Sequence, residues 1–391
     1  MKKAYFTPYG VGLGHASRLI MVANNLQSSK VEIRFSSFGE AVMYISIHGY
    51  ECVRVPAVEF AWNVKGEFSI KYTIANLPKW FTNFSRQVNN EVQNMIKYQP
   101  DIIVSDSRLS SLITAKFLGL PAIVILNQVK LLLSPRLREF KVARLFEKIN
   151  GEILGTMWTL ADKILIPDLP PPYTIAGHNV WDTSTIARKL EYIGFTAPKL
   201  CVTQEQLSKV AHYLGLDRSK PIVFIHVSGP METRMPIIRI AVEACKSLRQ
   251  EIQYIISEGR PNGNVEPKKL SGVGWYYEWC PVRDEIFAMS DLLVLRGGHV
   301  AISQAIQFGK PVVTIPIENH GEQLGNSEKI AEIGAGIMLK TKHLKANHVT
   351  HAINDILDDP EYQKKAYELM KLTEKLDGIN NIVNIVRSYI Q

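Results

Sequence analysis

Cysteine is scarce in this sequence, and the few cysteines form no pattern. The 391 residues include four of them, and none belongs to a Cys-x-x-Cys pair: Cys52, Cys201, Cys245 and Cys280. Structural zinc sites and disulfide-stabilised scaffolds need clustered or regularly spaced cysteines. The sequence therefore argues against both.

Long apolar runs are also missing. No stretch approaches the roughly 18 consecutive apolar residues that a membrane-spanning helix needs. The first ten residues, MKKAYFTPYG, start basic but lack the apolar segment of a secretory signal peptide, and they are typical of a first β-strand. We expect a cytoplasmic protein.

Acidic residues are under-represented in the first part of the chain. Residues 1–150 hold 19 Lys+Arg against 10 Asp+Glu, a net charge of +9, so with +8 for the whole chain the remainder carries −1. This asymmetry suggests a polyanionic partner for the first part only. Anionic lipid headgroups, a diphosphate and nucleic acid all satisfy it.

Short apolar runs alternate with longer helical stretches. Ten runs are candidate strands: Ala4–Pro8, Val31–Ser36, Ile102–Ser105, Ala122–Leu126, Lys163–Ile166, Ile222–His226, Gln253–Ile256, Gly274–Tyr277, Leu292–Leu295 and Val312–Ile315. Continuous rather than alternating apolar runs are typical of parallel strands buried on both faces. Their alternation with helices predicts an α/β fold with doubly wound parallel sheets.

This set of strands occurs twice, with a break between the two halves. The proline-dense stretch Pro167–Pro172 cannot continue a helix, and irregular chain follows it. We place one domain at 1–197 and a second at 198–370. For the C-terminal helical segment 371–391, a return to the first domain is one option.

The first candidate site is Gly10-Val-Gly12-Leu-Gly14-His15, between the first strand and a helical run. Glycines before a helix N-terminus let backbone amides approach an anion, and His15 would lie at the carboxyl end of a sheet, where α/β proteins bind ligands. The alternative is a nicotinamide-cofactor loop. The GxGxGH spacing and the lack of an acidic residue after the second strand disfavour that alternative.

Two further segments follow strands of the second half. In Arg296-Gly297-Gly298-His299, backbone amides and a helix dipole suit a diphosphate. The less favoured alternative is that His299 is a helix-capping or merely polar turn residue. The segment from Pro316 to Asn326 is crowded with acidic and amide groups, which suit sugar hydroxyls. An ordinary polar loop with a helix cap explains that segment equally well.

Together the segments resemble a known family. GVGLGH, followed by GGH-x4-Q-A-x3-G-K-P-x4-P-x5-E-Q-x2-N over Gly297–Asn326, is similar to the MurG-like glycosyltransferases of family 28. The resemblance implies the GT-B fold, in which two Rossmann-like domains face a cleft. Within that group the chain looks most like the archaeal N-glycosylation β-1,4-N-acetylglucosaminyltransferases, the chitobiose-lipid synthases.

The resemblance also implies roles for individual residues. The second domain would bind a nucleotide sugar through Ser228, Gly229, Trp279, Cys280, Gly297, Gly298, His299, Gln304, His320, Glu322 and Gln323. The Gly10, Gly12 and Gly14 loop would face the acceptor. Gln304 stands where MurG has the glutamate that binds the ribose, which makes uridine specificity less secure, and the first loop differs from MurG's GGTGGH, which argues against a peptidoglycan acceptor.

No Asp-x-Asp triplet occurs in the sequence, although metal-dependent sugar transferases use such carboxylates to hold a cation. We therefore expect an inverting transfer without metal or other cofactor, with UDP-N-acetylglucosamine as co-substrate and a polyprenyl or dolichyl diphosphate-linked N-acetylglucosamine as acceptor. His15 either removes the proton of the acceptor hydroxyl or positions the acceptor. Asp106 is a reserve base or the cap of the next helix.

The segment from Lys130 to Ile149 has an amphipathic pattern. Leu137, Phe140, Leu145 and Ile149 would share one helical face, and the basic residues spread over the rest: Arg136, Arg138, Lys141, Arg144 and Lys148. This pattern predicts peripheral docking on an anionic membrane, here the cytoplasmic face of the cell membrane. The alternative is a helix whose apolar face packs on the core.

Three rival functions remain open at this point. The first is another GT-B enzyme, either a glycolipid synthase or a nucleotide-sugar epimerase. The second is a nucleic-acid-binding protein, but the sequence contains no helix-turn-helix or aromatic RNA-binding strand. The third is an inactive scaffold, which the retention of both glycine–histidine loops disfavours.

Overall fold

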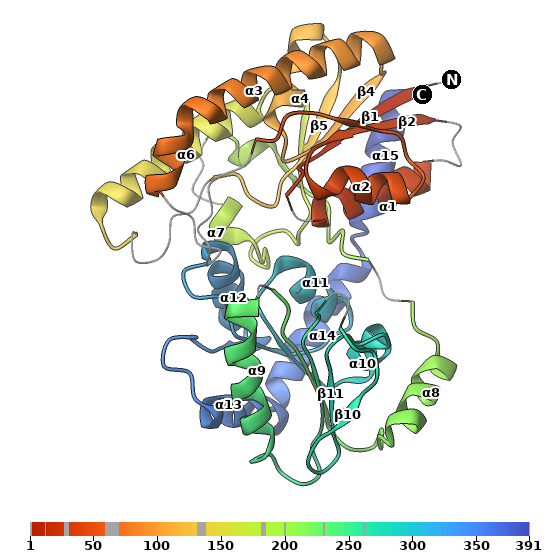
Figure 1. The fold of residues 1–391 in the computed structure, drawn as a ribbon, viewed down its shortest axis with the longest axis vertical. Helices are drawn as coiled ribbons and strands as arrows, with labels where there is room; N and C mark the ends of the chain where they lie inside the picture. The colour runs from red at the N-terminus through yellow and green to blue at the C-terminus, as the bar shows by residue number, and fades with distance from the viewer. Residues whose placement is uncertain are drawn as a thin grey trace. The chain divides into compact units, whose positions relative to one another are not determined.

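The computed structural model describes residues 2–11, 13–26, 31–58, 70–130, 138–180, 185–198, 201–229, 231–260 and 263–390, without the side chains of 70–75 and 77. The chain forms two compact units. One comprises Met1–Thr196 together with Leu376–Gln391, and the other comprises Ala197–Lys375. Figure 1 shows the elements of both units.

The first unit contains a seven-stranded parallel sheet with the order β3-β2-β1-β4-β5-β6-β7. Its strands are β1 Lys3–Pro8, β2 Glu32–Ser37, β3 Cys52–Arg54, β4 Ile102–Asp106, β5 Ala122–Ile125, β6 Lys163–Ile166 and β7 Leu190–Tyr192. Its helices are α1 Gly14–Leu26, α2 Glu40–Ile47, α3 Ile70–Tyr98, α4 Leu109–Leu118, α6 Lys141–Trp158, α7 Gly177–Val180, the 3-10 helix η2 Ala187–Lys189 and α15 Gly378–Ile390.

The second unit repeats this plan with the order β10-β11-β9-β8-β12-β13-β14, in which β10 alone runs antiparallel to its neighbour. Its strands are β8 Ile222–His226, β9 Gln253–Ser257, β10 Lys268–Lys269, β11 Gly274–Tyr277, β12 Leu292–Leu295, β13 Val312–Thr314 and β14 Gly336–Met338. Its helices are α8 Gln204–Leu214, α9 Met231–Cys245, α10 Arg283–Met289, α11 His299–Gln307, α12 Gly321–Ile333, α13 Ala346–Asp358 and α14 Pro360–Glu374.

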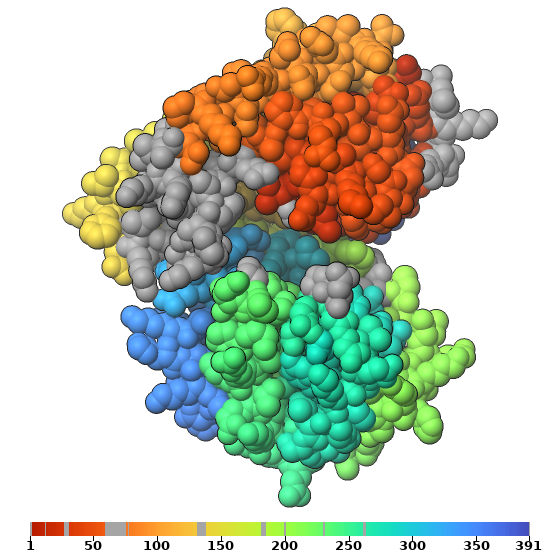
Figure 2. Space-filling view, in the orientation of Figure 1, coloured from red at the N-terminus to blue at the C-terminus, as the bar shows by residue number. Residues whose placement is uncertain are grey.

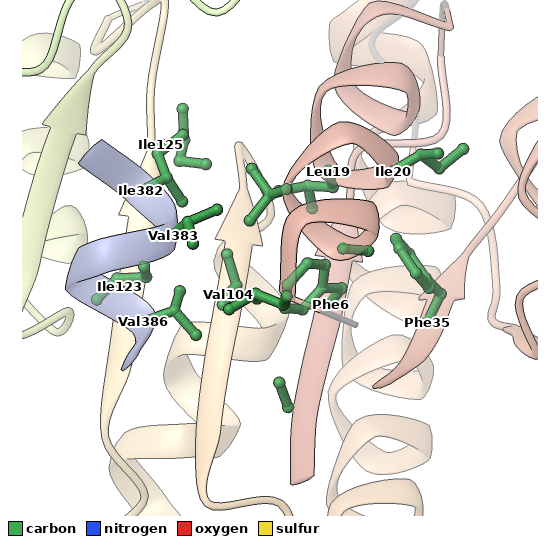
Figure 3. Close-up of a cluster of buried hydrophobic side chains, with 14 of the residues drawn as sticks. Phe6, Leu19, Ile20, Phe35, Val104, Ile123, Ile125, Ile382, Val383 and Val386 are labelled. Carbon is green, nitrogen blue, oxygen red and sulfur yellow. The ribbon is translucent and has the colours of Figure 1, made fainter. Parts of the chain in front are cut away.

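Apolar side chains cover both faces of the first sheet. On one face, Phe6, Phe35 and Val104 pack against α1 and against the C-terminal helix α15, whose Ile382 and Val386 point at the sheet (Figure 3). On the other face, a second buried cluster joins the sheet to α3, α4 and α6. Each fully buried aliphatic or aromatic side chain contributes about 1.5–3 kcal/mol, so the last helix is an integral part of the first unit.

The second sheet is built in the same way. Alternate residues of β8, β9, β12 and β13 form one buried cluster with α9 and α13, while α10 and α11 contact β8 and β12. Helices on both faces explain why these strands are apolar at nearly every position. The structure therefore has the predicted α/β class with two doubly wound sheets.

All ten predicted strands are present, with ends that shift by a residue or so. Four strands were not predicted: β3, β7, β10 and β14. Each lies at an edge of its sheet, is two or three residues long, and is partly exposed, so it shows no continuous apolar run. Within the described chain, no helix combines the length and apolarity that crossing a bilayer requires.

Candidate functional site

The strand order of each sheet identifies where a ligand would bind. In the first unit the chain moves outward from β1 in one direction and from β4 in the other, and in the second unit β8 and β12 are the corresponding pair. At such a switch point the loops that follow the two strands diverge and leave a crevice at their carboxyl ends. The predicted segments after β1, β8 and β12 all begin at these points.

In the first unit, His15 and Asp106 meet at the switch point. Pro8 of β1 is paired with Asp106 of β4, and His15 lies in the first turn of α1. The imidazole Nδ1 is 2.7 Å from Asp106 Oδ1. Nε2 has no hydrogen-bond partner among the described residues, and a quarter of the histidine side chain is exposed. With its proton on Nδ1, His15 presents a lone pair on Nε2, the arrangement of a general base.

Asp106 is fully buried and contacts two basic side chains, His15 and Arg18. Its second oxygen, Oδ2, lies 3.2 Å from Nε of Arg18, whose Nη1 donates to Asn127 at 2.9 Å. Arg18 was not predicted from the sequence, because only the fold brings α1 onto the end of β4. A buried carboxylate between two partners orients the imidazole and is not itself accessible to an acceptor.

The predicted alternative of Asp106 as a helix cap is wrong. Helix α4 begins at Leu109, its N-cap residue is Arg108, and no side chain caps it. Ser107, between them, adopts a left-handed conformation with φ 60°. This sharp turn separates the carboxylate from the helix that it was expected to cap.

A buried polar network supports this turn. Arg108 pairs with Glu91 of α3 and donates through Nη1 to the Ser36 carbonyl oxygen at 2.7 Å. Tyr5 donates to the second carboxylate oxygen of Glu91 at 2.9 Å. Breaking such a buried pair typically costs about 3–5 kcal/mol, because one charge is left uncompensated. The network therefore ties α3, β1 and β2 to the turn that follows Asp106.

The glycines of the first loop have different surroundings. Gly10 is buried, and a Cβ there would collide with the carbonyl oxygen and ring of Phe38, so its packing alone requires glycine. Gly14 begins α1, and a Cβ there would meet open space. Gly12 lies outside the described residues, and its predicted role stays a prediction.

In the second unit, three predicted loops lie together. A Cβ at Gly229 would be 3.8 Å from Cδ1 of Ile317, and one at Gly297 would be 2.8 Å from the carbonyl oxygen of Gln323. The loops after β8, β12 and β13 therefore line one edge of this sheet. Ser228 and Gly229 are exposed there.

The Gly297–Gly298 turn leads directly into α11. Gly297 has φ 81°, a conformation that suits glycine, and the carbonyl oxygen of Gly297 accepts from Nδ2 of the buried Asn326 at 3.2 Å. Gly298 is the N-cap residue of α11, and no side chain caps the first backbone amides of this helix. His299 is buried, with Nδ1 3.5 Å from Ser303 Oγ.

His320 and Gln323 organise the loop after β13. His320 is the N-cap of α12 and accepts from the Gln323 amide at 3.4 Å. The carboxamide oxygen of Gln323 accepts from the Ile317 amide at 2.9 Å. The helix-cap alternative is therefore correct for His320, and Glu322 occupies the first turn of α12, half-buried.

Gln304 is engaged inside the protein. Only 4% of it is exposed, and its carboxamide oxygen accepts from Nη2 of Arg283 at 2.7 Å. Its amide nitrogen lies 3.4 Å from the Pro198 carbonyl oxygen. A ribose would have to displace these contacts, so the fit of Gln304 to the predicted ribose role is poor.

Trp279 and Cys280, which the family resemblance assigns to nucleotide-sugar binding, follow β11. Trp279 is 42% exposed, but its backbone amide already donates to the Asn264 carbonyl oxygen at 3.1 Å. Cys280 is buried, and burial raises the pKa of its thiol to about 12, so it is an uncharged thiol at neutral pH. Binding of a nucleobase by Cys280 would therefore use its backbone groups rather than its side chain.

His226 was missed by the sequence analysis. It ends β8 at the switch point, and burial, reinforced by nearby Arg283, lowers the pKa of its imidazole to about 3. Its Nδ1 is buried without a hydrogen-bond partner in the described chain. Neutral at physiological pH, it contributes a polar nitrogen to this edge of the sheet without adding charge.

The predicted amphipathic helix over Lys130–Ile149 is wrong in its bounds. Helix α6 begins at Lys141, Phe140 is its exposed N-cap residue, and Arg138 is paired with Glu147 at 2.9 Å. Arg136 and Leu137 lie outside the described residues. The core-facing alternative is also wrong, because the apolar face of α6 is exposed.

That exposed face consists of side chains at helical spacing: Val142, Leu145, Phe146, Ile149 and Ile153. At about 100° per residue they form one stripe, opposite the side of the helix that the protein buries: Glu147, Gly151, Gly155 and Trp158. Lys141, Arg144 and Lys148 are exposed along one flank of the stripe. Figure 2 shows the residues of α6, in yellow, at the outer edge of the first unit.

Two family descriptions match the chain. Residues 3–146 match glycosyl transferase family 1, and residues 235–382 match the C-terminal domain of glycosyltransferase family 28. An uncharacterized glycosyltransferase of Methanosarcina acetivorans is 27% identical over 387 residues, 97% of each chain. A PGL/p-HBAD biosynthesis rhamnosyltransferase of Mycobacterium tuberculosis is 22% identical and covers 94% of this chain and 83% of its own.

Solved structures share the fold over the whole length. The calicheamicin glycosyltransferase CalG4 superposes with a TM-score of 0.72 at 15% identity, over 99% of this chain and 98% of its own. The spinosyn rhamnosyltransferase SpnG, complexed with thymidine diphosphate, gives a TM-score of 0.65 at 16% identity, over 99% and 100%. Both likenesses concern the two-domain architecture, since identity this low carries no information on substrate.

Proposed function

Since the chain is a glycosyltransferase of the GT-B type, we propose that it transfers N-acetylglucosamine from UDP-N-acetylglucosamine to a lipid-diphosphate-linked N-acetylglucosamine. The transfer would form a β-1,4 linkage with inversion and without a metal ion, and the product would serve N-glycan assembly. The GGH…EQ..N segment of the second unit supports the donor, and the His15–Asp106 pair supports the chemistry.

The His15–Asp106 pair is the observation that carries this proposal. Nε2 of His15 would accept the proton of the acceptor hydroxyl as the oxygen attacks the anomeric carbon, while Asp106 stabilises the imidazolium that forms. The sugar leaves the nucleoside diphosphate in the same step, which inverts the configuration. Asp106 therefore acts as a positioning residue and not as the base.

The leaving diphosphate would be stabilised by the second unit. Backbone amides at the start of α11, which no side chain caps, and the Gly297–Gly298 turn offer donors and a helix dipole to a developing negative charge. The carboxylate of Glu322 and the side-chain carboxamide nitrogen of Gln323 would bind hydroxyl groups of the donor sugar. His320, already used as a cap, would contact the donor through its second ring nitrogen.

A donor panel tests the proposal directly. Purified protein is incubated with the lipid-linked N-acetylglucosamine acceptor and UDP-N-acetylglucosamine, UDP-glucose or dTDP-rhamnose, the last because relatives include rhamnosyltransferases. We expect a disaccharide product with UDP-N-acetylglucosamine only, at an undiminished rate in EDTA. Turnover with dTDP-rhamnose alone, or epimerisation of UDP-N-acetylglucosamine without acceptor, would replace the proposed reaction.

We also propose that α6 docks on an anionic membrane at the cytoplasmic face, where a lipid-linked acceptor would be met. An apolar stripe directed away from the core, with three exposed cations beside it, matches an amphipathic helix lying in a bilayer interface. Water would otherwise hydrate five large apolar side chains at one place on the unit, a patch typical of an interaction site.

Vesicle binding tests this docking. Replacing Lys141, Arg144 and Lys148 together by alanine is expected to weaken binding to vesicles of phosphatidylcholine and phosphatidylserine about 100-fold, at about 1 kcal/mol per charge. Phe146→Glu should weaken binding to the same vesicles, while Phe117→Glu, at an even more exposed apolar residue of α4, should not. Equal effects of the two glutamate substitutions would contradict docking through α6.

A further inference from the structure

Arg296 stands apart from the other buried arginines. The described chain buries four: Arg18, Arg108, Arg234 and Arg296. The first three each face a carboxylate, namely Asp106, Glu91 and Glu258. Arg296 is only 5% exposed and pairs with no acidic group of the described residues; its Nε and Nη1 are buried without a hydrogen-bond partner there. Nη2 is therefore the guanidinium nitrogen that reaches the surface.

An unpaired buried cation is costly. Buried charges in proteins are normally paired or bound to a ligand, because removal from water is otherwise uncompensated. Burial lowers the pKa of Arg296 to about 10, which still leaves the guanidinium protonated at neutral pH. A protein that keeps such a charge without an internal partner is suited to receive an anion from outside.

The position of Arg296 identifies which anion. It directly follows β12, next to β8 at the switch point of the second sheet. The register that sets Val294 beside Ile225 brings Arg296 level with the start of the Val227–Gly229 loop. The next residues form the Gly297–Gly298 turn and the N-terminus of α11. Two features that attract anions, a helix N-terminus and an unpaired guanidinium, are thus adjacent.

We propose that Arg296 binds the diphosphate of the nucleoside diphosphate sugar and stays paired with the leaving diphosphate after transfer. The assignment rests on the proposed function and adds a charged residue to a site otherwise made of neutral donors. A guanidinium offers phosphate oxygens several N–H donors in fixed geometry. The full positive charge offsets the negative charge that grows on the leaving group without a metal ion.

Calorimetry and thermal unfolding of Arg296→Met test the proposal, with UDP, dTDP, uridine and inorganic pyrophosphate as probes. UDP affinity is expected to fall about 10- to 100-fold, the usual loss for a charge-assisted contact, while uridine affinity stays unchanged. The unliganded variant should unfold at the same or a higher temperature than the wild type, because it no longer buries an unpaired charge. Arg249→Met is the control, since Arg249 is exposed and paired with Glu251 and Asp358.

Each other outcome has a definite meaning. Unchanged UDP affinity in Arg296→Met, or a loss confined to pyrophosphate, overturns the proposal. Should the methionine variant fail to fold, Arg296→Lys is the second variant, because lysine keeps the positive charge but lacks the several N–H donors of a guanidinium. A UDP affinity of Arg296→Lys equal to that of the wild type would then overturn the proposal. A wild-type protein that binds neither UDP nor dTDP would instead overturn the proposed function, which separates the two failures.

Discussion

Replacing His15 by alanine is expected to lower kcat for sugar transfer by about 10²- to 10⁴-fold, the usual contribution of a positioned general base. The imidazole Nε2 is the proton acceptor, and neither Tyr9, whose ring packs edge-on against His15, nor the buried Asp106 replaces it. Initial rates at saturating donor and acceptor measure the loss. UDP affinity should stay at the wild-type value, because the nucleotide site belongs to the other unit.

His212→Ala is the matched control. His212 lies exposed on α8 and belongs to neither the proposed acceptor residues nor the proposed donor residues, so its removal should leave kcat unchanged. A folded His15→Ala protein with near-normal kcat would remove His15 from the chemistry. A raised KM with normal kcat would instead assign His15 to positioning the acceptor.

Asp106→Asn is expected to reduce kcat by about 10²- to 10⁴-fold while leaving the shape of the site intact. The carboxamide can present its nitrogen to His15 Nδ1, which would favour the tautomer with the proton on Nε2 and remove the base. It also withdraws the negative charge that stabilises an imidazolium. Rates are compared below the melting temperature, because Arg18 loses its carboxylate partner in this variant.

A double variant separates a positioning role from a general loss of structure. If Asp106 acts only through His15, adding Asp106→Asn to His15→Ala should slow transfer by no more than about threefold beyond His15→Ala alone. Fully multiplicative effects would show that the two residues act independently. The proposed pair would then be abandoned even though the two side chains are hydrogen-bonded.

The exposed apolar face of α6 lies beside three of the basic residues of the first part of the chain: Lys141, Arg144 and Lys148. The net charge of +9 over residues 1–150 was visible from composition, but its link to a surface required the orientation of α6. In an ordinary amphipathic helix of a globular protein the apolar stripe faces the core. Here the buried side carries Gly151, Gly155 and Trp158, and the apolar stripe is directed outward.

Local pattern was sufficient for the inner strands and insufficient for the edge strands. Strands such as β5 and β12 are buried on both faces, so every position is apolar and the run is visible in the sequence. Strand β3 is half-exposed, and β10 consists of two exposed lysines. Such segments become strands because the adjacent strand offers backbone hydrogen bonds, and the sequence of the segment itself does not reveal that neighbour.

The two repeated α/β sheets and the glycine–histidine loops that follow their strands could be predicted from local pattern, because burial and turn formation depend on residues close together in the chain. The hydrogen-bond and ion-pair partners of the site residues, in contrast, follow from the tertiary structure. His15 and Asp106 are 91 positions apart. Arg18 and Arg296 are equally buried, but Arg18 has Asp106 and Asn127 beside it, whereas Arg296 pairs with no acidic group of the described residues. Whether a buried charge is satisfied depends on what surrounds it in space, so that question could be answered only after the chain had folded.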